Sequence, residues 1–182
     1  LTLRGAPAFS VFRTQKLLAT LQESVPAVNN VYVEFVHFAH LSDALSEAEQ
    51  AVLAKLLSYG PSIDAQEGEG TQFVVVPRPG TISPWSSKAS DIAHNSGLAK
   101  IKRLERGTVY FVSGELSTEQ ASQVSAILHD RMVETVLSHP ADAEILFTSQ
   151  SPAPLTPVAI LCGCREALSR SNSSRLLYPA AG

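Results

Sequence analysis

Residues Val31–Pro61 read VYVEFVHFAHLSDALSEAEQAVLAKLLSYGP, and this stretch carries the clearest structural signals in the chain. Its first part, Val31–Phe38, is rich in β-branched and aromatic residues, which is typical of a well-buried strand. In its second part, Ser46 and Glu49 have the spacing of a capping box, in which each side chain accepts a hydrogen bond from the backbone N–H of the other residue. Gly60 and Pro61 then predict the end of the helix that begins there.

The same succession of strand and helix extends to both sides of this stretch. Upstream, Ser10 is a plausible N-cap of a helix that Pro26 ends. Downstream, Phe73–Val76 is a short apolar strand that Pro77 terminates. Residues 100–112, KIKRLERGTVYFV, predict a strand or a hairpin with a bulge at Gly107.

A second capping box, formed by Ser117 and Gln120, predicts one more helix. We expect this helix to end before Pro140, and its apolar face to consist of Ala121, Val124, Leu128, Met132 and Thr135. No internal sequence repeat is evident. Strands and helices thus alternate with short connections, and we expect an α+β fold with helices packed on one layer of sheet.

Composition sets limits on the class of protein. The chain has 182 residues, of which 45% are hydrophobic and 17% are charged, and its net charge is −3. This length fits one domain with a tail or linker, and the low charge suggests that something else covers part of the surface. The net charge gives no sign of a basic surface that would bind nucleic acid, and no apolar run is long enough for a membrane span. No signal peptide is evident, so we expect a cytoplasmic protein. Because the chain begins with leucine rather than methionine, we expect upstream residues to be missing.

The segment Val76–Leu98, VPRPGTISPWSSKASDIAHNSGL, is unusually specific for a connecting loop. Prolines stiffen its first part, and a helix is predicted from about Lys88 to Gly97. Hydroxyl groups and free backbone N–H groups would gather at the start of that helix, close to Arg78 and Lys88. Two interpretations stay open. One is an anion site formed by Arg78, Thr81 and Lys88, and the other is a contact surface built around Trp85.

Other motifs with catalytic or metal-binding potential are weak. His37 and His40 supply too few ligands for zinc, so no metal site is predicted. Cys162 and Cys164 are separated by a single residue, and we expect them to be free thiols. The sequence contains neither a Ser-His-Asp arrangement nor a phosphate-binding loop of the glycine-rich type.

Several motifs in the same order resemble the N-terminal domain of bacterial phosphoribosylformylglycinamidine synthase, the formylglycinamide ribonucleotide amidotransferase of the large single-chain form. These motifs are LRGAPAFSVFRTQKLL, VYVEFVHFAHL, LLSYGP, PRPGTISPWSSKASDIAHNSGL, RLERGTVYFV and LHDRMVETV, and the resemblance covers residues 3 to about 170. The resemblance implies a two-layer α+β fold, with helices packed on a mainly antiparallel sheet, that resembles a dimer of the small subunit found in multi-subunit versions of the enzyme.

The resemblance implies a carbon–nitrogen ligase of de novo purine biosynthesis. In that family ATP, with Mg²⁺, activates the amide of formylglycinamide ribonucleotide, and ammonia released from glutamine converts it to the amidine. Both reactions belong to synthetase and glutaminase domains that would follow in the longer polypeptide. We therefore expect this chain alone to be inactive, to bind no cofactor, and to self-associate through surfaces that its partner domains would cover.

Within the resemblance, the domain serves assembly and ammonia transfer. We expect residues 1–138 to form the scaffolding domain and residues 139–182 to begin a linker. The last residues, SSRLLYPAAG, depart from the family pattern, which predicts a truncation or a frameshift. The expected interdomain contact consists of Ser83, Trp85, Ser86, Ser87, Lys88 and Asp91. The alternative stays an independent phosphate-ligand-binding module, or a degenerate fragment, that uses the helix start at Thr81–Lys88.

Overall fold

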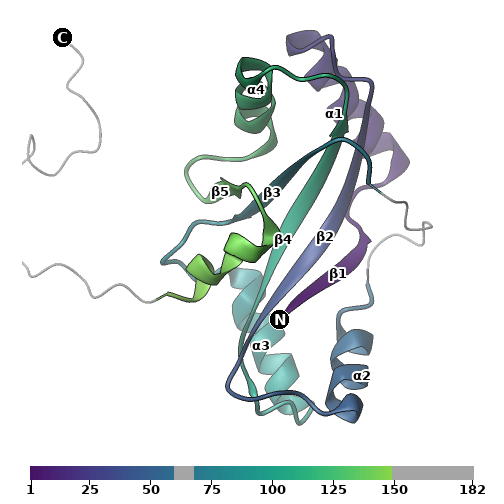
Figure 1. Cartoon of the computed structure of the whole chain (residues 1–182). Helices are drawn as coiled ribbons and strands as arrows, with labels where there is room; N and C mark the ends of the chain where they lie inside the picture. The colour runs from purple at the N-terminus through teal and green to yellow at the C-terminus, as the bar shows by residue number, and fades with distance from the viewer. Residues whose placement is uncertain (60–67, 149–182) are drawn as a thin grey trace, which may run out of the picture. The chain divides into compact units, whose positions relative to one another are not determined.

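The computed structural model describes residues 1–59 and 68–148. Figure 1 shows how the elements are arranged. In chain order they are β1 (Thr2–Pro7), α1 (Val11–Ser24), β2 (Asn30–Leu41), α2 (Glu47–Leu56), β3 (Thr71–Pro77), α3 (Pro84–Asn95), β4 (Ile101–Ser113), α4 (Thr118–Leu128), β5 (Glu134–Leu137) and the 3₁₀ helix η1 (Pro140–Phe147).

The strands form one sheet in the order β1-β2-β4-β3-β5, and all four strand pairs are antiparallel. The long central ladder joins β2 to β4, from Asn30 opposite Ser113 to His40 opposite Arg103. Helices pack on this sheet, so the prediction of an α+β fold with an antiparallel sheet is confirmed.

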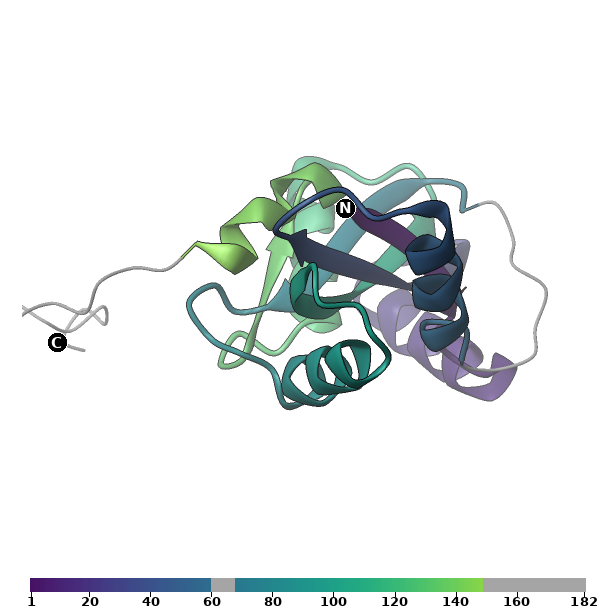
Figure 2. The ribbon, with the colours of Figure 1, turned by 90° about the horizontal axis from the view of Figure 1, so that it is seen from below.

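The two faces of the sheet are covered differently, because side chains alternate along each strand. On one face α1 and α4 bury a cluster that includes Val33 and Val112, and α2 and α3 bury a second cluster that includes Ala39 and Leu104. On the other face η1 covers a third cluster, to which β2 contributes Phe38. Figure 2 shows η1 and α3 on opposite sides of the sheet.

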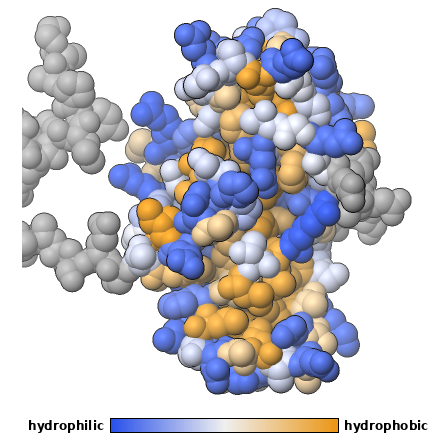
Figure 3. Space-filling model, in the orientation of Figure 1, coloured by the Kyte–Doolittle hydropathy of each residue, from blue (hydrophilic) through white to orange (hydrophobic). Residues whose placement is uncertain are grey.

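The face that carries η1 also exposes apolar surface. Figure 3 shows apolar residues gathered on its lower part, around the N-terminus and the end of β2. A depression of about 630 Å³ lies there between the strands and η1, and Leu1, Leu41 and Phe147 are among its lining residues. Leu1 is 54% exposed. This face therefore has apolar surface available for contact.

The order strand-helix-strand-helix occurs twice, as β1-α1-β2-α2 and as β3-α3-β4-α4. Both predicted capping boxes are confirmed, and they occupy the same place in the two halves: Ser46 and Glu49 at the start of α2, Ser117 and Gln120 at the start of α4. The halves meet at the β2–β4 ladder, where Val36 lies opposite Gly107. The repetition is one of structure, since the sequence shows no evident repeat.

For residues 100–112 the strand prediction is confirmed, but the bulge is not. The strand β4 runs from Ile101 to Ser113 without a hairpin, and no register shift occurs at Gly107, so the predicted bulge is wrong. Gly107 is required for close packing instead: a Cβ atom there would lie 2.9 Å from the carbonyl oxygen of Val75 and 3.0 Å from a methyl carbon of Val76. The glycine therefore lets the β3 backbone approach β4.

The predicted last helix is too long. α4 ends at Leu128, and His129 already has an extended backbone. Met132 is 73% exposed, and Thr135 lies in β5, opposite Val76 of β3. Met132 and Thr135 have helical spacing, but this part of the chain pairs with β3 instead of continuing the helix. The reason is that β5 forms backbone hydrogen bonds with the outer edge of β3, which would otherwise be unpaired.

Candidate functional site

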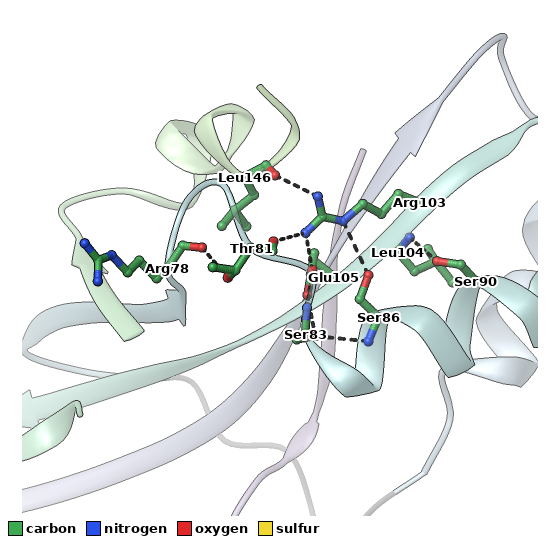
Figure 4. A network of polar contacts seen from close by, with 9 residues as sticks. All are labelled: Arg78, Thr81, Ser83, Ser86, Ser90, Arg103, Leu104, Glu105 and Leu146. Carbon is green, nitrogen blue, oxygen red and sulfur yellow. Dashed lines mark hydrogen bonds and ion pairs between the residues drawn. The ribbon is translucent and has the colours of Figure 1, made fainter. Parts of the chain in front are cut away.

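The segment that joins β3 to α3 lies over the first residues of β4, and Figure 4 shows its polar contacts. Gly80 has a φ of 82°, which permits the bend after Pro79. The backbone N–H of Thr81 donates to the carbonyl oxygen of Arg78 at 3.2 Å, and the Thr81 hydroxyl donates to the same oxygen at 2.6 Å. These bonds close a tight turn just before the helix.

Ser83 begins the helix, so the prediction of a start near Lys88 is wrong. Its Oγ accepts from the N–H of Ser86 at 3.0 Å, and Pro84 occupies the first helical position. Proline is well suited to that position because its missing N–H would have no partner within the helix. The predicted glycine at the other end is confirmed. The N–H of Gly97, whose φ is 85°, donates to the carbonyl oxygen of His94.

A carboxylate of the domain itself lies at this helix start. The Ser83 hydroxyl donates to Oε2 of Glu105 at 2.8 Å, and the Ser83 backbone N–H donates to Oε1 at 3.3 Å. Glu105 is fully buried. The negative charge that a helix N-terminus favours is therefore already present, supplied by the strand beneath the helix.

Arg103 connects this carboxylate with three other parts of the domain. Its guanidinium donates to Oε1 of Glu105, to the carbonyl oxygen of Thr81 at 2.7 Å and to that of Leu146 in η1 at 3.1 Å. Its Nε donates to Oγ of Ser86 at 3.4 Å. One arginine thus holds β4, the segment before α3, α3 itself and η1 together.

Trp85 packs against side chains from the sheet and from the chain after α2. Its ring centroid lies 5.6 Å from that of His37 and 6.5 Å from that of Tyr59. The guanidinium of Arg106 lies 5.1 Å from the Trp85 ring centroid. Trp85 is half-buried, so much of the indole stabilises the domain and the rest is available to a partner.

His37 in this cluster is neutral. Its Nε2 lies 2.6 Å from the Tyr59 hydroxyl, and its buried Nδ1 has no hydrogen-bond partner in the described structure. Burial, and then the charge of Arg106, lower the pKa of His37 from 6.5 to about 4. His40 lies on the other face of the sheet, where its ring centroid lies 5.2 Å from that of Phe147, so the two histidines do not converge.

The predicted contact residues have different environments. Ser87, Lys88 and Asp91 are exposed on α3, and Ser83 is half-buried and already hydrogen-bonded. Ser86 is 0% exposed. Its place on a contact surface is therefore corrected, because its hydroxyl points to Arg103 within the domain.

The three residues of the anion-site interpretation do not act together at the helix start. Arg78 is exposed, Thr81 uses its hydroxyl in the turn, and Lys88 lies in the second turn of α3. An added anion at the helix start would also meet the carboxylate of Glu105, which like-charge repulsion disfavours.

Other sites can be assessed only in the part of the chain that the structure describes. Within residues 1–59 and 68–148, no three His, Cys, Asp or Glu side chains gather as metal ligands would. No helix of that part is long and apolar enough to cross a membrane. Cys162 and Cys164 lie outside the described residues.

Sequence reasoning missed Arg103 and Glu105. The available signal was RLERG, residues 103–107, in which two opposite charges alternate with an apolar residue inside a buried strand. Alternating positions share one face of a strand, so the pattern was compatible with an ion pair under a neighbouring element.

Residues 34–147, more than half of the chain, match the model of one protein family, which is described as formylglycinamide ribonucleotide amidotransferase N-terminal. The match begins within β2 and ends with η1. It includes the whole β3–α3 segment and the strand that carries Arg103 and Glu105.

Proposed function

Since the chain belongs to the family of formylglycinamide ribonucleotide amidotransferase N-terminal domains, and so to an enzyme of purine biosynthesis, we propose that its own task in that enzyme is assembly. In this proposal the exposed side of α3, with Trp85 at its edge, is a contact surface for the synthetase and glutaminase domains. The contact residues are Ser83, Trp85, Ser87, Lys88 and Asp91.

The observation that carries the proposal is that the polar chemistry of the segment is directed inward. Glu105 is fully buried, and Ser83 and Arg103 satisfy its oxygens. A catalytic carboxylate has to reach a substrate, whereas this one holds the helix and the turn in place. A segment that is held in this way and presents the edge of Trp85 beside the exposed residues Ser87, Lys88 and Asp91 is better suited to recognition.

The proposal assigns the chemistry to the other domains. ATP, with Mg²⁺, would act in the synthetase domain and glutamine would be hydrolysed in the glutaminase domain, while this domain would help to hold them in register for ammonia transfer. The scaffold, expected over residues 1–138, would extend through η1, because η1 covers a core cluster and Leu146 accepts a hydrogen bond from Arg103. The linker, expected over residues 139–182, would then begin after η1. The repeated strand-helix-strand-helix order supports a fold like a dimer of a small subunit, with both halves in one chain.

The test is Trp85→Ala in an amidotransferase polypeptide that carries this domain with its synthetase and glutaminase domains. We expect the yield of amidine per glutamine hydrolysed to fall more than the rate of either half-reaction, because the loss acts on domain packing. Phe12→Ala is the matched control, since Phe12 is an exposed aromatic residue on α1. Unchanged coupling together with a loss of phosphate or substrate affinity would contradict the proposal and favour the anion site.

A further inference from the structure

A groove of about 330 Å³ lies between the end of α2 and α3, on the face of the sheet that the helices cover. Figure 1 shows these two helices at the same end of the sheet. Leu56, Tyr59, Trp85, Lys88, Ile92 and Arg106 are among the residues that line it. Its walls are thus mostly apolar and aromatic, with two cations.

The groove is open because α3 has small side chains where α1 has large ones. Ala93 is fully buried and Ser90 accepts a hydrogen bond from the N–H of Leu104 at 3.0 Å, so α3 lies close to β4. In the other half of the domain Leu17 and Leu18 of α1 pack into the core, and α1 contacts α4. In the part of the chain that the structure describes, the corresponding space between α2 and α3 is the groove.

Within the described residues, the two cations of the groove have no carboxylate partner. The ion pairs of the described residues involve Arg4, Lys100 and Arg103, and neither Lys88 nor Arg106 belongs to one. The guanidinium of Arg106 lies 4.4 Å from the ring centroid of Phe35 and 5.1 Å from that of Trp85. These rings hold a positive charge at the wall of an apolar groove. An occupant with a negative charge would therefore be attracted to the groove.

We propose that the groove is the docking site for a segment of the domains that follow in the amidotransferase polypeptide, and that this segment places an apolar side chain between α2 and α3 and a carboxylate beside Lys88 and Arg106. The inference rests on the proposed function and names the chemistry of the contact. Tryptophan, tyrosine and arginine, which all line the groove, are the residue types that dominate binding energy at protein interfaces.

Hydrogen exchange tests the docking in the polypeptide that contains all domains, with the present chain as reference. We expect amides of the last turn of α2 and of α3 to exchange more slowly in the complete polypeptide. Lys88→Glu should reduce this protection about tenfold, because charge reversal removes an attraction and adds a repulsion. Lys16→Glu, the same change on α1, should leave it unaltered.

The outcomes separate the groove from the broader interface. Two results together would contradict docking in the groove: protection of α3 that Lys88→Glu does not reduce, and no protection at the end of α2. The broader proposal of an interface on α3 would then remain. Absence of protection throughout α3 would overturn the proposed function as well. Lys88 is exposed, so the variant should fold, and a circular dichroism spectrum like that of the unaltered chain would verify this.

A small probe tests the chemistry in the present chain alone. Trp85 is the only tryptophan, so tryptophan emission reports on the groove directly. We expect 4-phenylbutyrate, an apolar ring with a carboxylate, to change the emission saturably, and the neutral 4-phenylbutanol to bind about tenfold more weakly. The assignment of a negative charge to the occupant would be wrong if both probes bound equally well. It would also be wrong if Lys88→Met left the affinity for 4-phenylbutyrate unchanged.

Discussion

Glu105 is the residue on which the geometry before α3 depends. Its carboxylate is fully buried and is paired with Arg103, whose side chain is 20% exposed. Glu105→Gln should lower the free energy of unfolding by about 3 kcal/mol or more, because a partly buried guanidinium is left without its countercharge. Urea unfolding measures this loss.

Glu34→Gln is the matched control for that prediction. Glu34 also lies in a strand of the central ladder and is paired with an arginine, but the side chain of that Arg4 is 50% exposed. Water can therefore solvate Arg4 when the charge of Glu34 is lost, and we expect a smaller loss, about 1 kcal/mol. Equal losses for the two variants would contradict the special position of Glu105.

His37 should make stability depend on pH. Its pKa is about 4 in the folded chain and 6.5 in the unfolded chain, so the unfolded chain binds more protons between these values. Stability should be full above pH 6.5 and fall by up to about 3 kcal/mol as the pH drops toward 4. Thermal unfolding across this range measures the slope, and His37→Gln should reduce it. An identical slope in both proteins would show that other groups cause it.

At the scale of elements, the predictions that succeeded depend on neighbours in the sequence. Ser46 and Glu49 cap α2 through bonds within one turn, and burial of apolar residues fixes β2 and β3. The start of α3 was also encoded locally, by Ser83 before Pro84, but the hydroxyl groups up to Ser87 gave several candidate caps. β5 could not be predicted, because its strand conformation depends on the edge of β3, which is distant in sequence.

The capping box of α4 gives a prediction at this scale. Ser117→Ala should lower the free energy of unfolding by about 1 kcal/mol, because the backbone N–H of Gln120 loses its acceptor. Ser122→Ala is the control, since Ser122 is exposed in the middle of the same helix and alanine favours helix there. No difference between the two variants would mean that the cap adds nothing to stability.

At the scale of the whole molecule, the site was only partly predictable. The sequence marked the β3–α3 segment and its tryptophan, because prolines, serines and a lone aromatic residue are visible locally. It could not show that Glu105 lies under Ser83 or that Tyr59 and Arg106 surround Trp85, since these contacts depend on the strand order. The buried position of Ser86 follows from the same packing.

Apolar surface on both faces predicts self-association of the chain. Ile92 on α3 is 53% exposed and Ile145 on η1 is 46% exposed. Sedimentation should show dimers or larger species at high concentration, because burial of such surface is favourable. Ile92→Ser should weaken this association more than Thr20→Ser, a change on the exposed side of α1. A monomer at all concentrations would contradict the prediction.

The β2–β4 ladder also has a consequence for synthesis of the protein. The first half of the domain, from β1 to α2, emerges from the ribosome before β4 has been synthesised. Until β4 emerges, the edge of β2 that pairs with it has no partner. At ordinary translation speeds the wait until Ser113 emerges lasts on the order of ten seconds. During this time a long apolar strand edge is exposed, in which Val31, Val33 and Phe38 are later buried. The nascent chain is therefore most vulnerable to aggregation, and most in need of a chaperone, in the interval between its two halves.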